Sequence, residues 1–390
     1  MTRKLIENIS IVNDADETVG NLLVDDGVII GINVDNGDPN EVIDGGGSTL
    51  LPGFIDVHNH GAVGHDVNDS TAEELLEVSA FLARNGVTAW LPTLVPDSDE
   101  NYQRIIGEID RLMELQKGKA IAQAFGVHYE GVFANEAMCG ALRPEHFKNF
   151  KAGTTKQHEI TRNKTSVLPK LKKGVHMTTL APEVDGGIEL IRELVAEGWI
   201  VSIGHTRADT KTLDAAFDAG ARHMTHFFNA MTGIHHRDIG VAGWGLAKKE
   251  VGFDIIADGI HVAREMLEFA CRSKGVDKVS LISDSVAPTG QGDGEYELWG
   301  ERISVVNGRT RNERGSIAGS VITMQEAVRE MLSFGFSTAE VAQMVSTNPA
   351  KLIGADKERG SIDIGKRADI VAIGADGHVR FTMIDGEFAR

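Results

Sequence analysis

The sequence predicts an α/β fold in which a (β/α)8 TIM-like barrel carries a small β-sandwich built from both termini. From Phe54 onward, strand-like apolar runs alternate eight times with helical patterns, which is typical of such a barrel. Both ends of the chain read instead as short alternating β runs separated by Asp-Gly and Gly-Gly turns. The 390 residues suffice for one large domain with a smaller companion.

The two ends of the chain are expected to form one domain. Residues 4–52 read as antiparallel β rather than βαβ, with runs at Leu5–Val12, Asn21–Val24 and Gly27–Val34. The tail, Gly360–Arg390, returns to short β runs with turns at Asp376 and Asp385. We therefore expect residues 1–53 and 355–390 to pair into the sandwich, and residues 54–354 to form the barrel.

The barrel strands are predicted from apolar runs and the helices from amphipathic periodicity. The eight strands are Phe54–His58, Val87–Pro92, Ala124–Glu130, Met177–Ala181, Ile200–Gly204, His223–Phe227, Phe253–Ala257 and Val279–Ser283. The helical patterns between them are Thr71–Arg84, Asp99–Gln116, Gly187–Glu197, Asp209–Ala219 and Arg264–Ser273, and two more follow at Thr323–Phe334 and Thr338–Ser346.

Charge and cysteine content restrict the partners and the compartment. The 39 basic and 57 acidic residues give a formal charge of −18, which disfavours binding to nucleic acid or to an anionic membrane. Cys139 and Cys271 are too few for a disulfide framework, which favours a reducing compartment. The N-terminus has no apolar core of signal-peptide length, and no run of about 18 apolar residues occurs. We expect a soluble cytoplasmic protein.

A His-x-His pair ends the first barrel strand. In the stretch Leu51–Gly64, His58 and His60 lie two residues apart, and alternate strand residues project to the same face. Neutral imidazole nitrogens suit zinc or iron. The pair alone is weak evidence, since solvated loop histidines have the same spacing.

Further polar residues follow other predicted strands. Glu130 ends the third strand, His205 the fifth, His226 the sixth and Asp284 the last. Taken singly, they could be a surface carboxylate, a histidine near a helix cap, a core histidine and a turn-capping aspartate. Taken together with the His-x-His pair, they converge on the barrel end that carries active sites.

These residue types suit metal-assisted hydrolysis. Glu130 can give an anionic oxygen, and His205 and His226 can give neutral nitrogens, which leaves a coordination position for water. A bound metal lowers the pKa of that water. Asp284 can then take the proton of the water and pass it to a leaving amine. No lysine at the end of the third or fourth strand suits a bridging role, which would fall to Glu130.

The order and spacing of these motifs resemble the N-acetylglucosamine-6-phosphate deacetylase family of the amidohydrolase superfamily. The likeness runs nearly end to end. It is carried by PGFIDVHNHG (52–61), HYEGVF (128–133), LAPE (180–183), SIGHT (202–206), THFFNAM (225–231), HHRDIG (235–240), DGIHV (258–262), SDS (283–285), AGSVITMQEAVR (318–329) and STNPAKLIG (346–354).

The resemblance implies a role for each matching residue. It implies a primary metal on Glu130, His205 and His226, with Asp284 as general base and then acid. His58 and His60 match the position that supports a second metal. Substrate contacts are implied for Asn229, Ala230 and His261, where His261 also polarises the acyl carbonyl. His236 and Arg237 would bind the phosphate across a homodimer interface, and the guanidinium fork of Arg237 suits phosphate oxygens.

Three motifs depart from the family pattern. Val132 replaces the proline that usually follows Glu-Gly, and Asp238-Ile239-Gly240 replaces Glu-Pro-Gly. Leu142 replaces a histidine that contacts sugar hydroxyls. The metal-binding and proton-transfer positions are intact, so the departures concern the sugar and not the chemistry.

The sequence therefore predicts a metal-dependent deacetylase of a phosphorylated amino sugar, with N-acetylglucosamine 6-phosphate as the first candidate. It is expected to use zinc or iron, at one site or two. Leu142 keeps N-acetylgalactosamine 6-phosphate and other N-acyl amino sugars open as substrates. Other cyclic-amide or N-acyl amino-acid hydrolases are disfavoured by His236 and Arg237. A non-catalytic sugar-phosphate-binding relative is disfavoured by the intact Asp284 and metal positions.

Overall fold

The computed structural model describes residues 3–13, 16–35, 37–150 and 167–389. Eight parallel strands lie side by side in chain order and form the predicted barrel. They are β5 (Phe54–Asn59), β8 (Val87–Leu94), β10 (Gly126–Phe133), β11 (Val175–Leu180), β12 (Ile200–Ile203), β13 (His223–Met224), β14 (Gly252–Ile256) and β15 (Val279–Ile282). A short strand, β9 (Gln123–Ala124), pairs with β8.

The barrel closes just beyond the last strand. The amide of Asp284 donates to the carbonyl of His58 at 2.9 Å, and the amide of His60 donates to the carbonyl of Ser285 at 2.8 Å. These bonds join the chain after β15 to the end of β5, so two candidate site segments meet at the seam. The expectation of a (β/α)8 barrel is confirmed.

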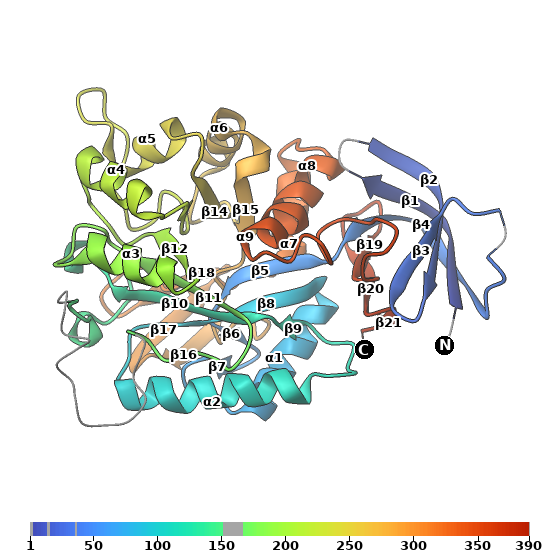
Figure 1. Cartoon of the computed structure of the whole chain (residues 1–390), viewed down its shortest axis with the longest axis horizontal. Coiled ribbons are helices and arrows are strands. Elements are labelled where there is room, and N and C mark those ends of the chain that lie inside the picture. The colour runs from blue at the N-terminus through green and yellow to red at the C-terminus, as the bar shows by residue number, and fades with distance from the viewer. Residues whose placement is uncertain (1–2, 14–15, 36, 151–166, 390) are drawn as a thin grey trace.

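Helices cover the outside of the barrel (Figure 1). They are α1 (Ala72–Arg84), α2 (Asp99–Leu115), α3 (Gly187–Ala196), α4 (Thr210–Ala219), α5 (Gly240–Ala247), α6 (Arg264–Lys274), α7 (Met324–Ser333), α8 (Thr338–Ala342) and α9 (Asn348–Leu352), with a π-helical turn at Gln343–Thr347. Helix α1 illustrates how the sequence specifies these helices. Thr71 and Glu74 form a capping box, and Leu75, Val78 and Leu82 are buried on one face.

Helix α5 was not predicted. Its sequence, GVAGWGLA, contains no polar residue with which to form a solvent-facing side, and Gly240–Gly245 are all buried. Without an amphipathic period and with three glycines, the segment carries no helical signal in the sequence.

Both termini contribute to one seven-stranded sheet, as expected. Its strands, in spatial order, are β21 (Glu387–Phe388), β20 (Val379–Ile384), β19 (Ile370–Ile373), β4 (Glu41–Pro52), β1 (Arg3–Asn13), β2 (Asp16–Asp25) and β3 (Val28–Ile32). The edge strand β3 bonds back to residues 365–368. The sheet thereby folds over a core of its own, which includes Ile6, Leu22, Leu50 and Ile370.

One pairing differs from the antiparallel expectation for residues 4–52. Strand β4 runs parallel to β1, although β1 and β2 are antiparallel. Strand β4 passes through Gly53 directly into β5, so its direction is set by the need to enter the barrel.

A three-stranded antiparallel insert between β15 and α7 was not predicted. It consists of β16 (Gly294–Leu298), β17 (Glu301–Val306) and β18 (Arg309–Asn312), and a two-stranded ribbon, β6 (Gly61–Ala62) with β7 (His65–Asp66), lies after β5. Leu298 and Ile303 pack against Val286 and Ala318 below the insert. The alternation of Ile303 and Val305 beside Asn307-Gly308 was a usable hairpin signal.

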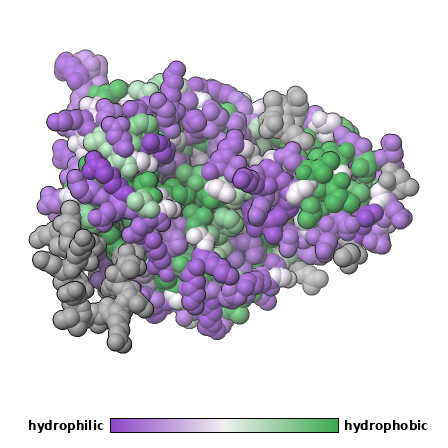
Figure 2. All heavy atoms as spheres, viewed as in Figure 1, coloured by the Kyte–Doolittle hydropathy of each residue, from purple (hydrophilic) through white to green (hydrophobic). Residues whose placement is uncertain are grey.

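The terminal sheet lies at one end of the molecule, beside the barrel, and both chain ends are near it (Figure 1). Figure 2 shows that hydrophilic residues cover much of this face of the molecule, while a hydrophobic area lies over the terminal sheet. Within the described residues, no helix has the length and apolar character needed to cross a membrane.

Candidate active site

The candidate site residues come from the carboxyl ends of the barrel strands. Glu130 lies near the end of β10, and His205, His226 and Asp284 lie in the turns that leave β12, β13 and β15. Those three have positive φ values of 48°, 33° and 50°. Such backbone is uncommon for residues other than glycine and clusters at functional sites. The chain therefore turns sharply after each strand at these three positions.

A first group of metal-ligating atoms joins Glu130, His205 and His226. The Oε1 atom of Glu130 lies 2.9 Å from Nε2 of both histidines, and the two Nε2 atoms are 3.1 Å apart. Each of the three residues is at most 5% exposed. The three atoms are close enough together to share one ion.

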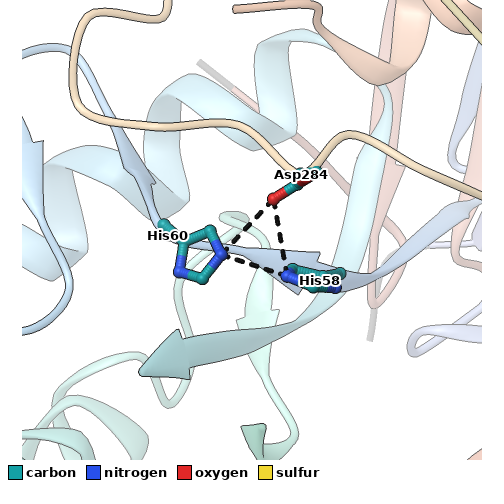
Figure 3. A group of neighbouring side chains, drawn as sticks. All are labelled: His58, His60 and Asp284. Carbon is teal, nitrogen blue, oxygen red and sulfur yellow. Dashed lines mark hydrogen bonds and ion pairs between the residues drawn. The ribbon is translucent and has the colours of Figure 1, made fainter. Parts of the chain in front are cut away.

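A second group joins His58, His60 and Asp284 (Figure 3). The Nε2 atoms of the two histidines are 3.0 Å apart, and Oδ1 of Asp284 lies 3.4 Å from the first and 3.3 Å from the second. Oε2 of Glu130 lies 3.1 Å from Nε2 of His60. The carboxylate of Glu130 thus has one oxygen facing each group.

The hydrogen bonds around the imidazoles fit a divalent metal. Nδ1 of His60 lies 3.1 Å from the carbonyl oxygen of Thr93, and Nδ1 of His205 lies 2.8 Å from that of Met138. A carbonyl oxygen can only accept, so these Nδ1 atoms carry protons, and each Nε2 is the nitrogen left to bind a metal at the centre of the site. This arrangement is how proteins orient metal-binding histidines, and the nitrogen and carboxylate atoms suit zinc or iron.

Charge couples the two groups strongly. Burial lowers the pKa of His60, but hydrogen bonds with Asp284 and Glu130 outweigh it and raise that pKa to about 10, so a metal ion that binds Nε2 must displace a proton from it. Burial raises the pKa of Glu130, but the charge of His58 and hydrogen bonds from His205 and His226 bring it well below its usual range. The same balance of burial against the charge of His58 leaves the pKa of Asp284 lowered. Both carboxylates are therefore ionised, as metal ligands must be.

Several buried residues that support these groups were not predicted. Asp254 accepts from the backbone amide of His226 and lies 3.2 Å from Nε2 of His223. His128 packs its ring against that of His58, with centroids 4.7 Å apart. The sequence does show an aspartate, Asp254, inside the apolar run FDII. A charged residue in a run expected to be buried was the signal that could have identified it.

The expected substrate residues divide between two places. Asn229, Ala230 and His261 line one cavity with both metal-ligating groups, and Leu142, Trp299 and Ile317 form further walls of it. Asp258, which was not predicted, fixes His261, since its Oδ2 lies 2.6 Å from Nδ1. The buried Nδ2 atom of Asn229 has no hydrogen-bond partner.

His236 and Arg237 lie elsewhere. Both are exposed in the loop between β13 and α5, and they are not among the residues that line the cavity of their own chain. Nη1 of Arg237 lies 2.7 Å from Nε2 of His236. The structure therefore does not bring these two residues into the site formed by the other nine.

The barrel and its metal-ligating groups define a hydrolase of the metal-dependent amidohydrolase class. The chain matches the Amidohydrolase family model over residues 49–389 and belongs to that family. It is 34% identical over 369 residues to N-acetylgalactosamine-6-phosphate deacetylase of Escherichia coli O157:H7, covering 94% of each chain. It is 35% identical over 349 residues to N-acetylglucosamine-6-phosphate deacetylase of Bacillus subtilis, covering 88% of this chain and 85% of the relative.

A solved structure gives the same picture of the fold. The crystal structure of N-acetylglucosamine-6-phosphate deacetylase from Pasteurella multocida superposes with a TM-score of 0.88 at 28% sequence identity, covering 99% of both chains. The likeness therefore includes the terminal sheet as well as the barrel.

Proposed function

We propose that the protein hydrolyses the N-acetyl group of a phosphorylated amino sugar, with N-acetylglucosamine 6-phosphate as the first candidate and acetate as one product. The observation that carries the proposal is the convergence of Glu130, His205 and His226 with Asp284 in one cavity. The names of the relatives support the substrate class.

In this proposal Glu130, His205 and His226 hold a divalent metal, zinc or iron, and His58, His60 and Asp284 offer a second position. A metal bound there supplies a Lewis acid and lowers the pKa of water. Asp284, ionised and facing the cavity, accepts the proton of the attacking water and donates it to the leaving nitrogen. His261, held through Nδ1 by Asp258, presents Nε2 to the acyl oxygen. The free amide of Asn229 binds the sugar.

The proposed phosphate site requires a second copy of the chain. His236 and Arg237 lie on an exposed loop. Two apolar residues of the same loop, Ile234 and Ile239, are 49% and 39% exposed. Exposed apolar side chains beside a basic pair favour a protein interface. We infer a homodimer, in a cytoplasmic enzyme, in which this loop carries Arg237 to the phosphate bound by the partner subunit.

N-Acetylgalactosamine 6-phosphate is the second candidate substrate. Leu142 is a buried wall of the cavity and cannot hydrogen-bond to a hydroxyl. A site without that polar contact discriminates weakly between two sugars that differ only in the orientation of one hydroxyl. The Escherichia coli relative bears the name of this activity.

A substrate panel tests the proposal. Acetate release is measured with both N-acetylhexosamine 6-phosphates and with both unphosphorylated sugars, and metal content is measured on the same sample. We expect turnover of at least one phosphorylated sugar by protein that contains zinc or iron. Metal-loaded protein that releases acetate from none of the four would refute the proposal and favour a binding protein.

A further inference from the structure

One hairpin turn in the insert has a residue that its backbone does not favour. Five two-residue turns in the described chain have positive φ at both positions, and three of them are Asp26-Gly27, Asn307-Gly308 and Asp385-Gly386. Asn-Gly and Asp-Gly are the preferred sequences for this geometry. The other two are Val63-Gly64, between β6 and β7, and Trp299-Gly300, in which the φ values are 53° and 77°. A bulky residue is strained there, so the turn itself does not explain the tryptophan.

The indole of Trp299 is fixed in the wall of the active-site cavity. Its Nε1 atom donates to Oδ2 of Asp66 at 3.0 Å. Its ring lies edge-on to the ring of His60, with centroids 5.5 Å apart and planes at 79°. The hairpin therefore places a rigid aromatic side chain beside the second metal-ligating group.

The cavity is lined by side chains of two chemical kinds. Asn229 and His261 offer hydrogen-bonding groups, whereas Trp299 and Ile317 offer an apolar surface. In the proposed reaction the amide nitrogen must face Asp284, and the sugar attached to it lies among the polar groups. In a trans amide the acyl chain points away from the substituent on nitrogen. We therefore place the acyl chain against the apolar surface of Trp299, next to His60.

We propose that Trp299 is a specificity-determining residue that closes the acyl side of the cavity and restricts the enzyme to short acyl groups such as acetyl. The inference rests on the proposed deacylation and adds the acyl chain length to it. This role explains why a tryptophan is found in a turn that strains it: the indole occupies the space that a longer acyl chain would need.

The test variant is Trp299→Asn, which removes the ring and gives the turn its preferred Asn-Gly sequence. The kcat/KM is measured with N-acetyl-, N-propionyl- and N-butyryl-glucosamine 6-phosphate. One methylene in an apolar pocket changes kcat/KM by roughly 10- to 200-fold. We expect the butyryl-to-acetyl ratio to rise at least about tenfold, with Tm unchanged or higher. Trp299→Phe should give an intermediate ratio.

Asn307→Ala is the matched control, because it alters the other turn of the same sheet. It should lower Tm and leave the acyl ratio unchanged. The inference is overturned if the ratio in Trp299→Asn stays within about threefold of wild type, or if all activity is lost at unchanged Tm. Wild-type protein that releases no acyl group from these three sugars or from N-acetylgalactosamine 6-phosphate would refute the proposed function itself, whereas normal acetate release with an unaltered ratio would refute only the role of Trp299.

Discussion

Replacing Asp284 by asparagine separates proton transfer from the folding of the site. The substitution keeps the size of the side chain, but an amide cannot accept a proton near neutral pH. Asp284 has a positive φ of 50°, a conformation that asparagine also tolerates. We therefore expect Asp284→Asn to fold with a wild-type Tm.

The expected loss of activity follows from the two proton transfers that pass through this carboxylate. General acid–base catalysis contributes about 10²- to 10⁴-fold. Because one residue takes the proton and later donates it, we expect kcat to fall by about 10³- to 10⁴-fold, or roughly 4–5.5 kcal/mol. The first metal-ligating group does not include Asp284, so its metal should remain.

The assay measures kcat and KM for acetate release together with metal content and Tm. Asp277→Asn is the control, since this exposed aspartate lies just before β15 and away from the cavity. It should leave kcat unchanged. If Asp284→Asn keeps kcat within about tenfold of wild type at equal metal content, Asp284 is not the proton-transfer group.

Three further predictions address substrate binding, orientation and stability. Arg237→Ala should raise KM for the phosphorylated sugar about tenfold or more and leave KM for the unphosphorylated sugar unchanged, and an unaltered KM for both would exclude phosphate binding there. Asp258→Asn should lower kcat by about 10- to 100-fold at constant Tm because it loosens His261, and a kcat within about twofold of wild type would contradict that role. Thr323→Ala removes the hydroxyl that accepts from the amide of Glu326 at the start of α7. Urea unfolding should show a loss of about 1 kcal/mol with kcat unchanged, and no loss would show that this cap does not contribute.

The repeated alternation of strand-like runs with helical patterns was sufficient to predict the barrel, although β13 has only two residues in the structure. The same reasoning placed His58, Glu130 and His205 at strand ends, where a closed barrel brings them together. Helix α5 escaped prediction because a helix buried on all sides has no polar face. Trp299 was not predicted because its role depends on where the hairpin of β16 and β17 packs. The residue pattern within these two strands does not indicate that the hairpin contacts the active-site cavity.

His236 and Arg237 show a different limit. Their motif is recognisable in the sequence, but the fold of one chain leaves them on an exposed loop away from the cavity. Local sequence patterns describe how a segment folds, and they do not say whether a side chain acts in its own subunit or in a neighbouring one.

The continuity of β4 and β5 has a consequence for how the enzyme matures on the ribosome. Strand β4 pairs with β19, and Pro52 lies opposite Ile370. Strand β4, which leads directly into the first barrel strand, therefore gains its pairing with β19 only when residues 370–388 have been synthesised. Until then one side of β4 exposes unpaired amides and carbonyls, which makes a nascent or truncated chain a target for chaperones and proteases. A chain that stops short of β19 is expected to be degraded rather than to accumulate as a partly active enzyme.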